Sequence, residues 1–124
     1  WGFQLTAVRA SDGEGIGTFL LDDDSLQIVS GADGGHPELA SRSYVEHTII
    51  GDRDGIASPV EWTFSWRAPD MPQDTALFFC AGNATNKSQS PGGDFIFTAR
   101  DTVLDESTPV RAVTWGAVKR RYRN

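Results

Sequence analysis

Hydrophobic and polar residues alternate with a period of two in short stretches of the chain, and turn-forming residues separate these stretches. The clearest stretch is VEWTFSW, residues 60–66, in which a valine and three aromatic residues occupy every second position. This alternation is typical of an antiparallel strand with one buried face. The opening WGFQLTAV predicts a second strand of this kind, with Trp1, Phe3, Leu5 and Ala7 on one face.

Further strands are predicted along the rest of the chain, in the order IGTFLL, SLQIV, SYVEHTII, TALFFCA, DFIFTA and finally VRAVTW at 110–115. TALFFCA is almost entirely apolar and is expected to be a central strand. The segment SGADGGHPELAS is expected to be a loop, and RDTVLDESTP is a polar connection. About seven or eight short strands predict an all-β, immunoglobulin-like antiparallel β-sandwich, with a closed barrel as the alternative. The predicted sandwich covers residues 1–115, and a basic tail covers 116–124.

The chain has 124 residues, a length that suits one domain, and a net charge of −6 that is unevenly distributed. Residues 1–110 contain six basic and 17 acidic residues, whereas the last 14 residues contain five basic and no acidic ones. Because an acidic body repels phosphate backbones, nucleic acid is not expected as a partner. The tail residues Lys119, Arg120, Arg121 and Arg123 either form a solvated end or dock onto an acidic protein surface or anionic lipid.

The predicted strand at residues 1–8 begins directly at Trp1. Two explanations stay open: a leader has been removed, or the sandwich lacks its first strand or strands. A sandwich without its first strand would expose a sheet edge, which makes Trp1 and Phe3 candidates for a partner interface. No apolar run approaches the length of a membrane-spanning helix.

His47 points to the same face as Val45 and Ile49 if SYVEHTII is one strand. The favoured interpretation is a structural core histidine that is hydrogen-bonded to a backbone carbonyl or an asparagine side chain. A two-histidine metal site would require the loop that carries His36 to fold over the strand.

The polar loop at residues 82–94 offers Asn83, Asn86 and Asp94 as oxygen ligands for Ca²⁺. The alternative is local, because asparagine side chains cap turns and Lys87 disfavours a cation beside it. The acidic run at residues 22–24 is expected to be a solvated turn.

Cys80 is the only cysteine, so it forms no internal disulfide, and a structural buried thiol is expected. Trp62 and Trp66 are assigned to core packing rather than to a sugar-binding platform. The sequence contains no nucleophile elbow, no HExxH motif and no phosphate-binding loop, so no enzymatic activity is predicted.

Five segments in this order resemble the reelin-type (reeler) domain, known in bacteria as the choice-of-anchor V domain: WGFQLTAV, SYVEHTIIG, WTFSWRAP, LFFCAGNATN and GDFIFTA. The resemblance covers about residues 1–100 and implies a non-catalytic, extracytoplasmic β-sandwich, usually tethered by a variable C-terminal anchor. Relatives usually have strands before the first segment, and many bacterial ones have a Cys-x-x-Cys-His haem-attachment motif there. This chain has no such motif, so no haem is assigned to it.

The resemblance predicts an accessory or adhesion module that joins other protein subunits, with a periplasmic electron-transfer or photosynthetic membrane complex as one host. The alternative is a cell-surface module that binds Ca²⁺ or glycan through the loop at residues 82–94.

Overall fold

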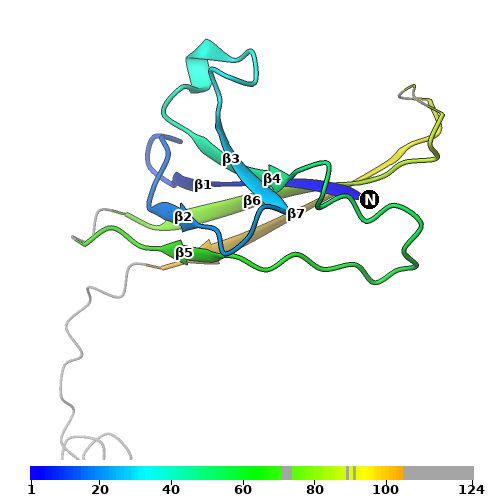
Figure 1. Cartoon of the computed structure of the whole chain (residues 1–124). Coiled ribbons are helices and arrows are strands. Elements are labelled where there is room, and N and C mark those ends of the chain that lie inside the picture. Colours follow the sequence, from blue (N-terminus) through cyan, green and yellow to red (C-terminus); the bar gives the residue numbers. More distant parts are fainter. Residues whose placement is uncertain (71–73, 89, 91, 105–124) are drawn as a thin grey trace, which may run out of the picture.

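The computed structural model describes residues 1–70, 74–88, 90 and 92–104, and these residues form two antiparallel sheets. The elements, in chain order, are β1 (Gly2–Arg9), β2 (Thr18–Leu20), β3 (Leu26–Ser30), the 3₁₀ turn η1 (Pro37–Leu39), β4 (Ser43–His47), β5 (Ser65–Arg67), β6 (Ala76–Ala84) and β7 (Phe95–Val103). The large sheet has the order β3-β4-β1-β6-β7, and the small sheet pairs β2 with β5 (Figure 1). This arrangement confirms an all-β antiparallel sandwich. The predicted strand at 110–115 and the tail at 116–124 lie outside the described residues.

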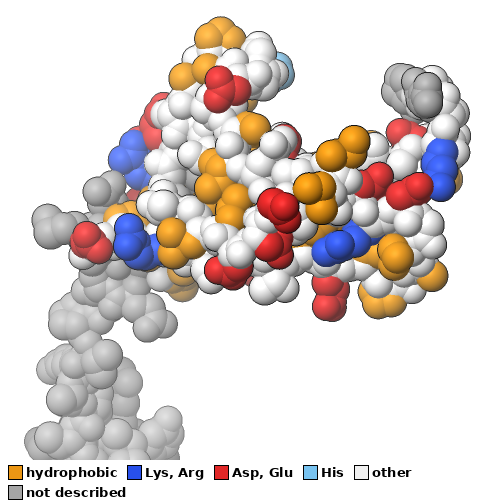
Figure 2. Space-filling view, viewed as in Figure 1, with side chains coloured by type: hydrophobic (Ala, Val, Ile, Leu, Met, Phe, Trp, Pro, Cys, Tyr) orange, Lys and Arg blue, Asp and Glu red, His pale blue; other side chains and the backbone are white. Residues whose placement is uncertain are grey.

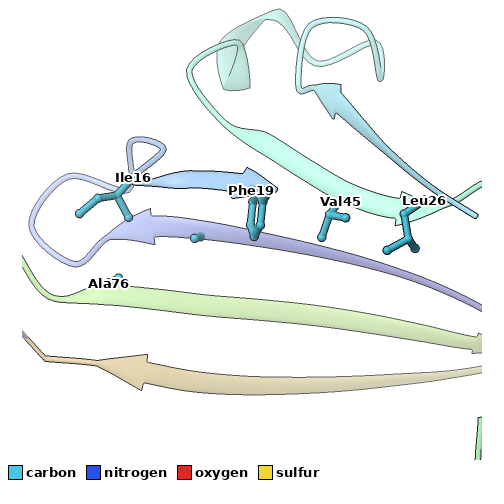
Figure 3. Packing of buried hydrophobic residues seen from close by; sticks show 6 residues of the cluster. Ile16, Phe19, Leu26, Val45 and Ala76 are labelled. Carbon is cyan, nitrogen blue, oxygen red and sulfur yellow. The ribbon is translucent and has the colours of Figure 1, made fainter. Parts of the chain in front are cut away.

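The core lies between the small sheet and one face of the large sheet, which we call the inner face and which carries Phe3, Leu5 and Ala7. Its buried members are Ala7, Ile16, Phe19, Leu26, Val45 and Ala76, five of which are labelled in Figure 3. They come from β1, β2, β3, β4 and β6 and from the turn before β2. Alternation along each strand directs these apolar side chains to one side.

The segment at 60–66 was predicted as a full strand, but only its end joins a ladder, as β5. The reason is that β2 offers only three residues, which pair Thr18 with Arg67 and Leu20 with Ser65. The alternation of side chains still holds. Trp62, Phe64 and Trp66 are half-buried against the core, and the residues between them are exposed.

Two indole N–H groups fix this segment over the core. The Nε1 of Trp62 donates to the carbonyl of Gly51 at 2.8 Å, and the Nε1 of Trp66 donates to the carbonyl of Ile16 at 3.1 Å. A tryptophan buries a large apolar surface and needs a partner for its single donor, and both needs are met here. The structural assignment of Trp62 and Trp66 agrees with these contacts.

The strand predicted at 43–50 ends at His47, so Ile49 does not share the inner face. The chain turns here because Thr48 is bonded to the preceding acidic turn: its hydroxyl donates to the carbonyl of Asp24 at 2.7 Å. Ile49 is consequently 93% exposed. At the other end of the chain, β7 is longer than predicted, because its register with β6 continues through RDTV until Val103 lies opposite Ala76.

We expect Leu26→Ala to lower the free energy of unfolding by about 2–4 kcal/mol, because it leaves a cavity in the closed part of the core. The matched variant Ile49→Ala removes similar atoms from an exposed side chain and should change that free energy by no more than about 0.5 kcal/mol. Urea unfolding followed by tryptophan fluorescence measures both. Equal losses in the two variants would contradict the placement of Ile49 outside the core.

Candidate functional site

The predicted free edge at residues 1–8 is wrong, because β1 is the middle strand of the large sheet. It pairs with β4 on one side and along its whole length with β6 on the other, from Gly2 opposite Asn83 to Arg9 opposite Ala76. The prediction came from the position of this strand at the start of the sequence, which does not determine its place in the sheet.

Trp1 and Phe3, the two residues assigned to that edge, are engaged within the chain. The Phe3 ring stacks on Phe64 with centroids 6.1 Å apart and lies 4.7 Å from the Trp62 ring. The indole Nε1 of Trp1 donates to the carbonyl of Ile56 at 2.9 Å. The Phe3 side chain therefore packs on the second layer of the sandwich, and the Trp1 side chain is bonded to the connection between β4 and β5.

In the part of the chain that the structure describes, the large sheet has two margins, the five-residue β3 and the nine-residue β7, and β7 is the longer and the more exposed of the two (Figure 1). Among the described residues it pairs with β6 alone, and all nine of its residues are exposed. Its exposed apolar side chains include Phe95 at 69%, Ile96 at 62% and Phe97 at 58%. A long, apolar and exposed edge strand is unusual in a protein, because it can pair with another chain.

The register with β6 assigns each β7 side chain to a face. Phe95, Phe97 and Val103 lie opposite Ala84, Gly82 and Ala76, and so belong to the inner face. Ile96 lies opposite Asn83 and belongs to the outer face. The inner-face phenylalanines of β7 stay exposed because the core side chains of the small sheet cover β4, β1 and β6.

An open groove of about 540 Å³ adjoins one of these phenylalanines, Phe97. Its lining includes Phe3, Trp62, Phe64, Cys80 and Phe97. It lies between the inner face of the large sheet and the extended segment that leads into β5. The exposed row of β7 and this apolar groove together form the candidate functional site, which we call the β7 face. Figure 2 shows the wider surface, where hydrophobic side chains are interspersed with acidic ones.

Cys80 lines this groove on β6, opposite Leu5 of β1 and Ala99 of β7. The sequence predicted a buried thiol, and the structure shows a half-buried one. Burial raises the pKa of the Cys80 thiol above its ordinary value. A raised pKa lowers the thiolate fraction, so the microenvironment is that of a structural cysteine rather than a nucleophile.

His47, at the end of β4, is half-buried and lines a second open groove, of about 380 Å³, together with Trp1 and Gly2. Its Nδ1 lies 3.3 Å from both the backbone nitrogen and the backbone oxygen of Phe3, so it accepts from the one or donates to the other according to its tautomer. Its ring centroid is 6.3 Å from that of Trp62. These contacts agree with a structural histidine held by backbone.

His36 forms a separate, exposed contact, with its Nδ1 3.1 Å from Glu38 Oε1. Among the described residues, no three His, Cys, Asp or Glu side chains come together as a metal site would require. In the same part of the chain, no helix is long and apolar enough to cross a membrane.

The structure brings together the three residues proposed as calcium ligands, although the loop predicted at 82–94 begins only after Ala84. Asn83 lies in β6, and Asn86 and Asp94 lie in the loop between β6 and β7. The Asp94 carboxylate accepts from the backbone N–H of Asn86 at 3.1 Å and from the Asn83 amide at 3.5 Å. The Asn86 amide oxygen accepts from the N–H of Ser88 at 2.9 Å. These oxygens therefore already have N–H partners, which is the local, turn-capping arrangement. The Asn83 Oδ1 is buried and has no partner among the described residues.

Lys87 ties this loop to another one, since its Nζ lies 2.7 Å from Asp54 Oδ1. The hydrogen bond from Lys87 holds the pKa of Asp54 below its ordinary value. The acidic turn at 22–24 is exposed, as expected, and hydrogen bonds from the side chain and backbone of Ser25 lower the pKa of Asp23.

Comparisons with known protein families, with curated proteins and with solved structures found no match for this chain. The resemblance to reeler domains therefore stays a prediction. Lys119, Arg120, Arg121 and Arg123, the other residues proposed for a partner interface, lie outside the described residues.

Sequence analysis missed the β7 face as a site. The available signal was the run FIFTARDTV, which places apolar residues at both parities of a predicted strand. A strand with apolar residues on both faces is either a central strand that is buried on both faces or an edge strand that leaves apolar side chains exposed. Only the sheet order distinguishes the two cases.

We expect iodoacetamide to alkylate Cys80 more slowly than an exposed thiol at about pH 8, because burial raises its pKa and leaves less thiolate. The rate should continue to rise at pH values where the exposed thiol is already fully ionised. Mass spectrometry measures both rates, with the double variant Cys80→Ala/Ser90→Cys as the exposed control. Equal rates for the two thiols would contradict the burial of Cys80 in the groove.

We expect the double variant Asn83→Ala/Asp94→Ala to lower the unfolding temperature by about 4 °C, since it removes hydrogen bonds worth about 1 kcal/mol. The fall should be the same in Ca²⁺ and in chelator, because the carboxylate serves N–H groups. Differential scanning fluorimetry measures it, with Asp22→Ala as a control for the lost charge. A larger fall in Ca²⁺ than in chelator would instead favour the calcium-site hypothesis.

Proposed function

We propose that this protein is a non-catalytic β-sandwich module that joins a larger protein assembly through its β7 face. The observation that carries the proposal is the open edge of β7, a nine-residue strand that is exposed along its whole length and pairs with β6 alone among the described residues. The mechanism is strand addition, in which a partner segment extends the large sheet beyond β7.

The hydrogen bonds of β7 support an edge that is available for pairing. The backbone N–H of Thr102 donates to the carboxylate of its neighbour Asp101 at 2.7 Å instead of to a strand. Because N–H groups alternate between the two sides of an antiparallel strand, those of Thr98 and Arg100 point to the same free edge. An added strand would provide carbonyl partners for these groups.

Burial of apolar surface adds to this pairing. The inner-face side chains Phe95 and Phe97 are more than half exposed, and Phe97 borders the aromatic groove. An apolar residue of the partner opposite Phe97 would cover this ring and reach the groove. Burying a phenylalanine contributes about 1.5–3 kcal/mol, so two such rings can support a specific contact.

The resemblance to reeler domains supports the cellular setting of the proposal. It implies an extracytoplasmic protein, in the periplasm or at the cell surface, that works as an accessory or adhesion subunit. A bacterial electron-transfer or photosynthetic membrane complex is the host that this resemblance favours, and it rests on family association. The basic tail at 119–123 supplies a second contact in this proposal, to an acidic protein surface or anionic lipid.

The test is the native mass of the chain purified from its source in mild detergent, with partners identified by mass spectrometry. We expect a large assembly, and we expect Thr98→Pro to reduce co-purification at least about tenfold, because proline removes an edge N–H and is tolerated on edge strands. Thr98→Ala is the matched control, since it keeps that N–H. Recovery of the wild type as a stable monomer of 13.5 kDa would overturn the proposal.

A further inference from the structure

We propose that β7 selects its partner by charge, accepting a strand with a lysine or arginine opposite Asp101 and an aspartate or glutamate opposite Arg100. The occupant is a segment of a different protein, with apolar side chains at the positions opposite Phe95 and Phe97. The inference rests on the proposed function and specifies the chemistry of the partner at the same face.

Arg100 and Asp101 are the charged residues of β7, and they point to opposite faces. Arg100 lies opposite Phe79 on the outer face, and Asp101 lies opposite Phe78 on the inner face. Both are exposed, and neither forms an ion pair with another described residue. Each charged side chain therefore has an aromatic residue of β6 on one side. On its other side, at the margin of the sheet, a residue of a partner strand would lie directly opposite it.

A second copy of this chain does not satisfy these charges. In antiparallel pairing, residues directly opposite each other point to the same face of the sheet. Arg100 could then face only an even-numbered residue of the second β7, and Asp101 only an odd-numbered one. No register brings the two opposite charges together, and the registers centred on residue 100 or 101 place like charges face to face. Self-pairing therefore neutralises neither charge in any register, and in two registers it is repulsive.

A different strand can satisfy both charges at once, because its two consecutive residues need only carry the opposite signs in the matching order. The acidic body of the chain favours a partner that is basic beyond this pair as well, since residues 1–110 contain 17 acidic and six basic residues. Glu61 lines the groove together with Phe97, and Asp94 lies directly before β7. The partner is therefore an extended, amphipathic segment with basic flanks.

The test uses a probe peptide designed for this face, Val-Thr-Lys-Glu-Val-Thr-Ile-Thr-Val, which runs antiparallel to β7 with its lysine opposite Asp101 and its glutamate opposite Arg100. The control peptide exchanges only the lysine and the glutamate, so composition and apolar pattern are identical. We expect the probe to bind the full chain about five- to tenfold more tightly, as two cross-strand charge pairs change from repulsive to attractive. Chemical-shift changes of the β7 amides in NMR titration measure both affinities.

The double variant Arg100→Asp/Asp101→Arg should reverse the preference between the two peptides, which no general loss of folding would do. Equal binding of both peptides to the wild type would overturn the charge selection and leave β7 docking intact. If neither peptide shifts the β7 amide resonances at a peptide concentration of about 1 mM, β7 docking itself is overturned, since any binding would then be weaker than millimolar. A dimer of the chain that Thr98→Pro dissolves would also overturn the inference, because the occupant would then be a second copy.

Discussion

The constraint on which the rest of the structure depends is the difference in size between the two sheets. The large sheet has five strands, and two of them contain nine residues each, whereas the small sheet consists of two three-residue strands. The hydrophobic face of a sheet must be covered by another layer to be buried. The small sheet and its aromatic extension close the core over β4, β1 and β6, where Val45 is fully buried. This layer does not extend over β7. The small size of the second sheet therefore explains both the closed core and the exposed strand.

Residue alternation predicted much of the fold, because the faces of a strand are a local property. The inward direction of Phe3, Leu5 and Ala7 and the packing of Trp62 and Trp66 follow from period-two patterns alone. Sheet order is not local, since it depends on which segments meet across the chain. The central place of β1 follows from its pairing with β4 and β6, more than 30 residues away, and no pattern within residues 1–8 encodes it.

Two predicted strand ends were misplaced, one near Ile49 and one in β7, and in both cases the pairing of the backbone explains the difference. Ile49 continues the apolar parity of Val45, yet the hydroxyl of Thr48 bonds to the acidic turn and the chain leaves the sheet. A single tertiary hydrogen bond, between residues 24 positions apart, thus overrides a hydrophobic pattern at the point where the ladder ends. In β7 the reverse holds, because the polar residues RDTV remain in the strand where β6 supplies partners for their backbone. Backbone pairing, rather than side-chain polarity, decides where each strand stops.

The adjacent charges of β7 resolve a conflict that an open edge creates. An exposed apolar strand invites association with copies of itself, and inward-pointing charges are one of the devices by which proteins prevent this. Asp101 is such a charge, because it interrupts the apolar row that runs from Phe95 to Val103 on the inner face. Its neighbour Arg100 places the opposite charge on the other face, so no copy of the strand can neutralise either one. A foreign strand can neutralise both, and the same two residues therefore discourage self-association while they permit a specific partner.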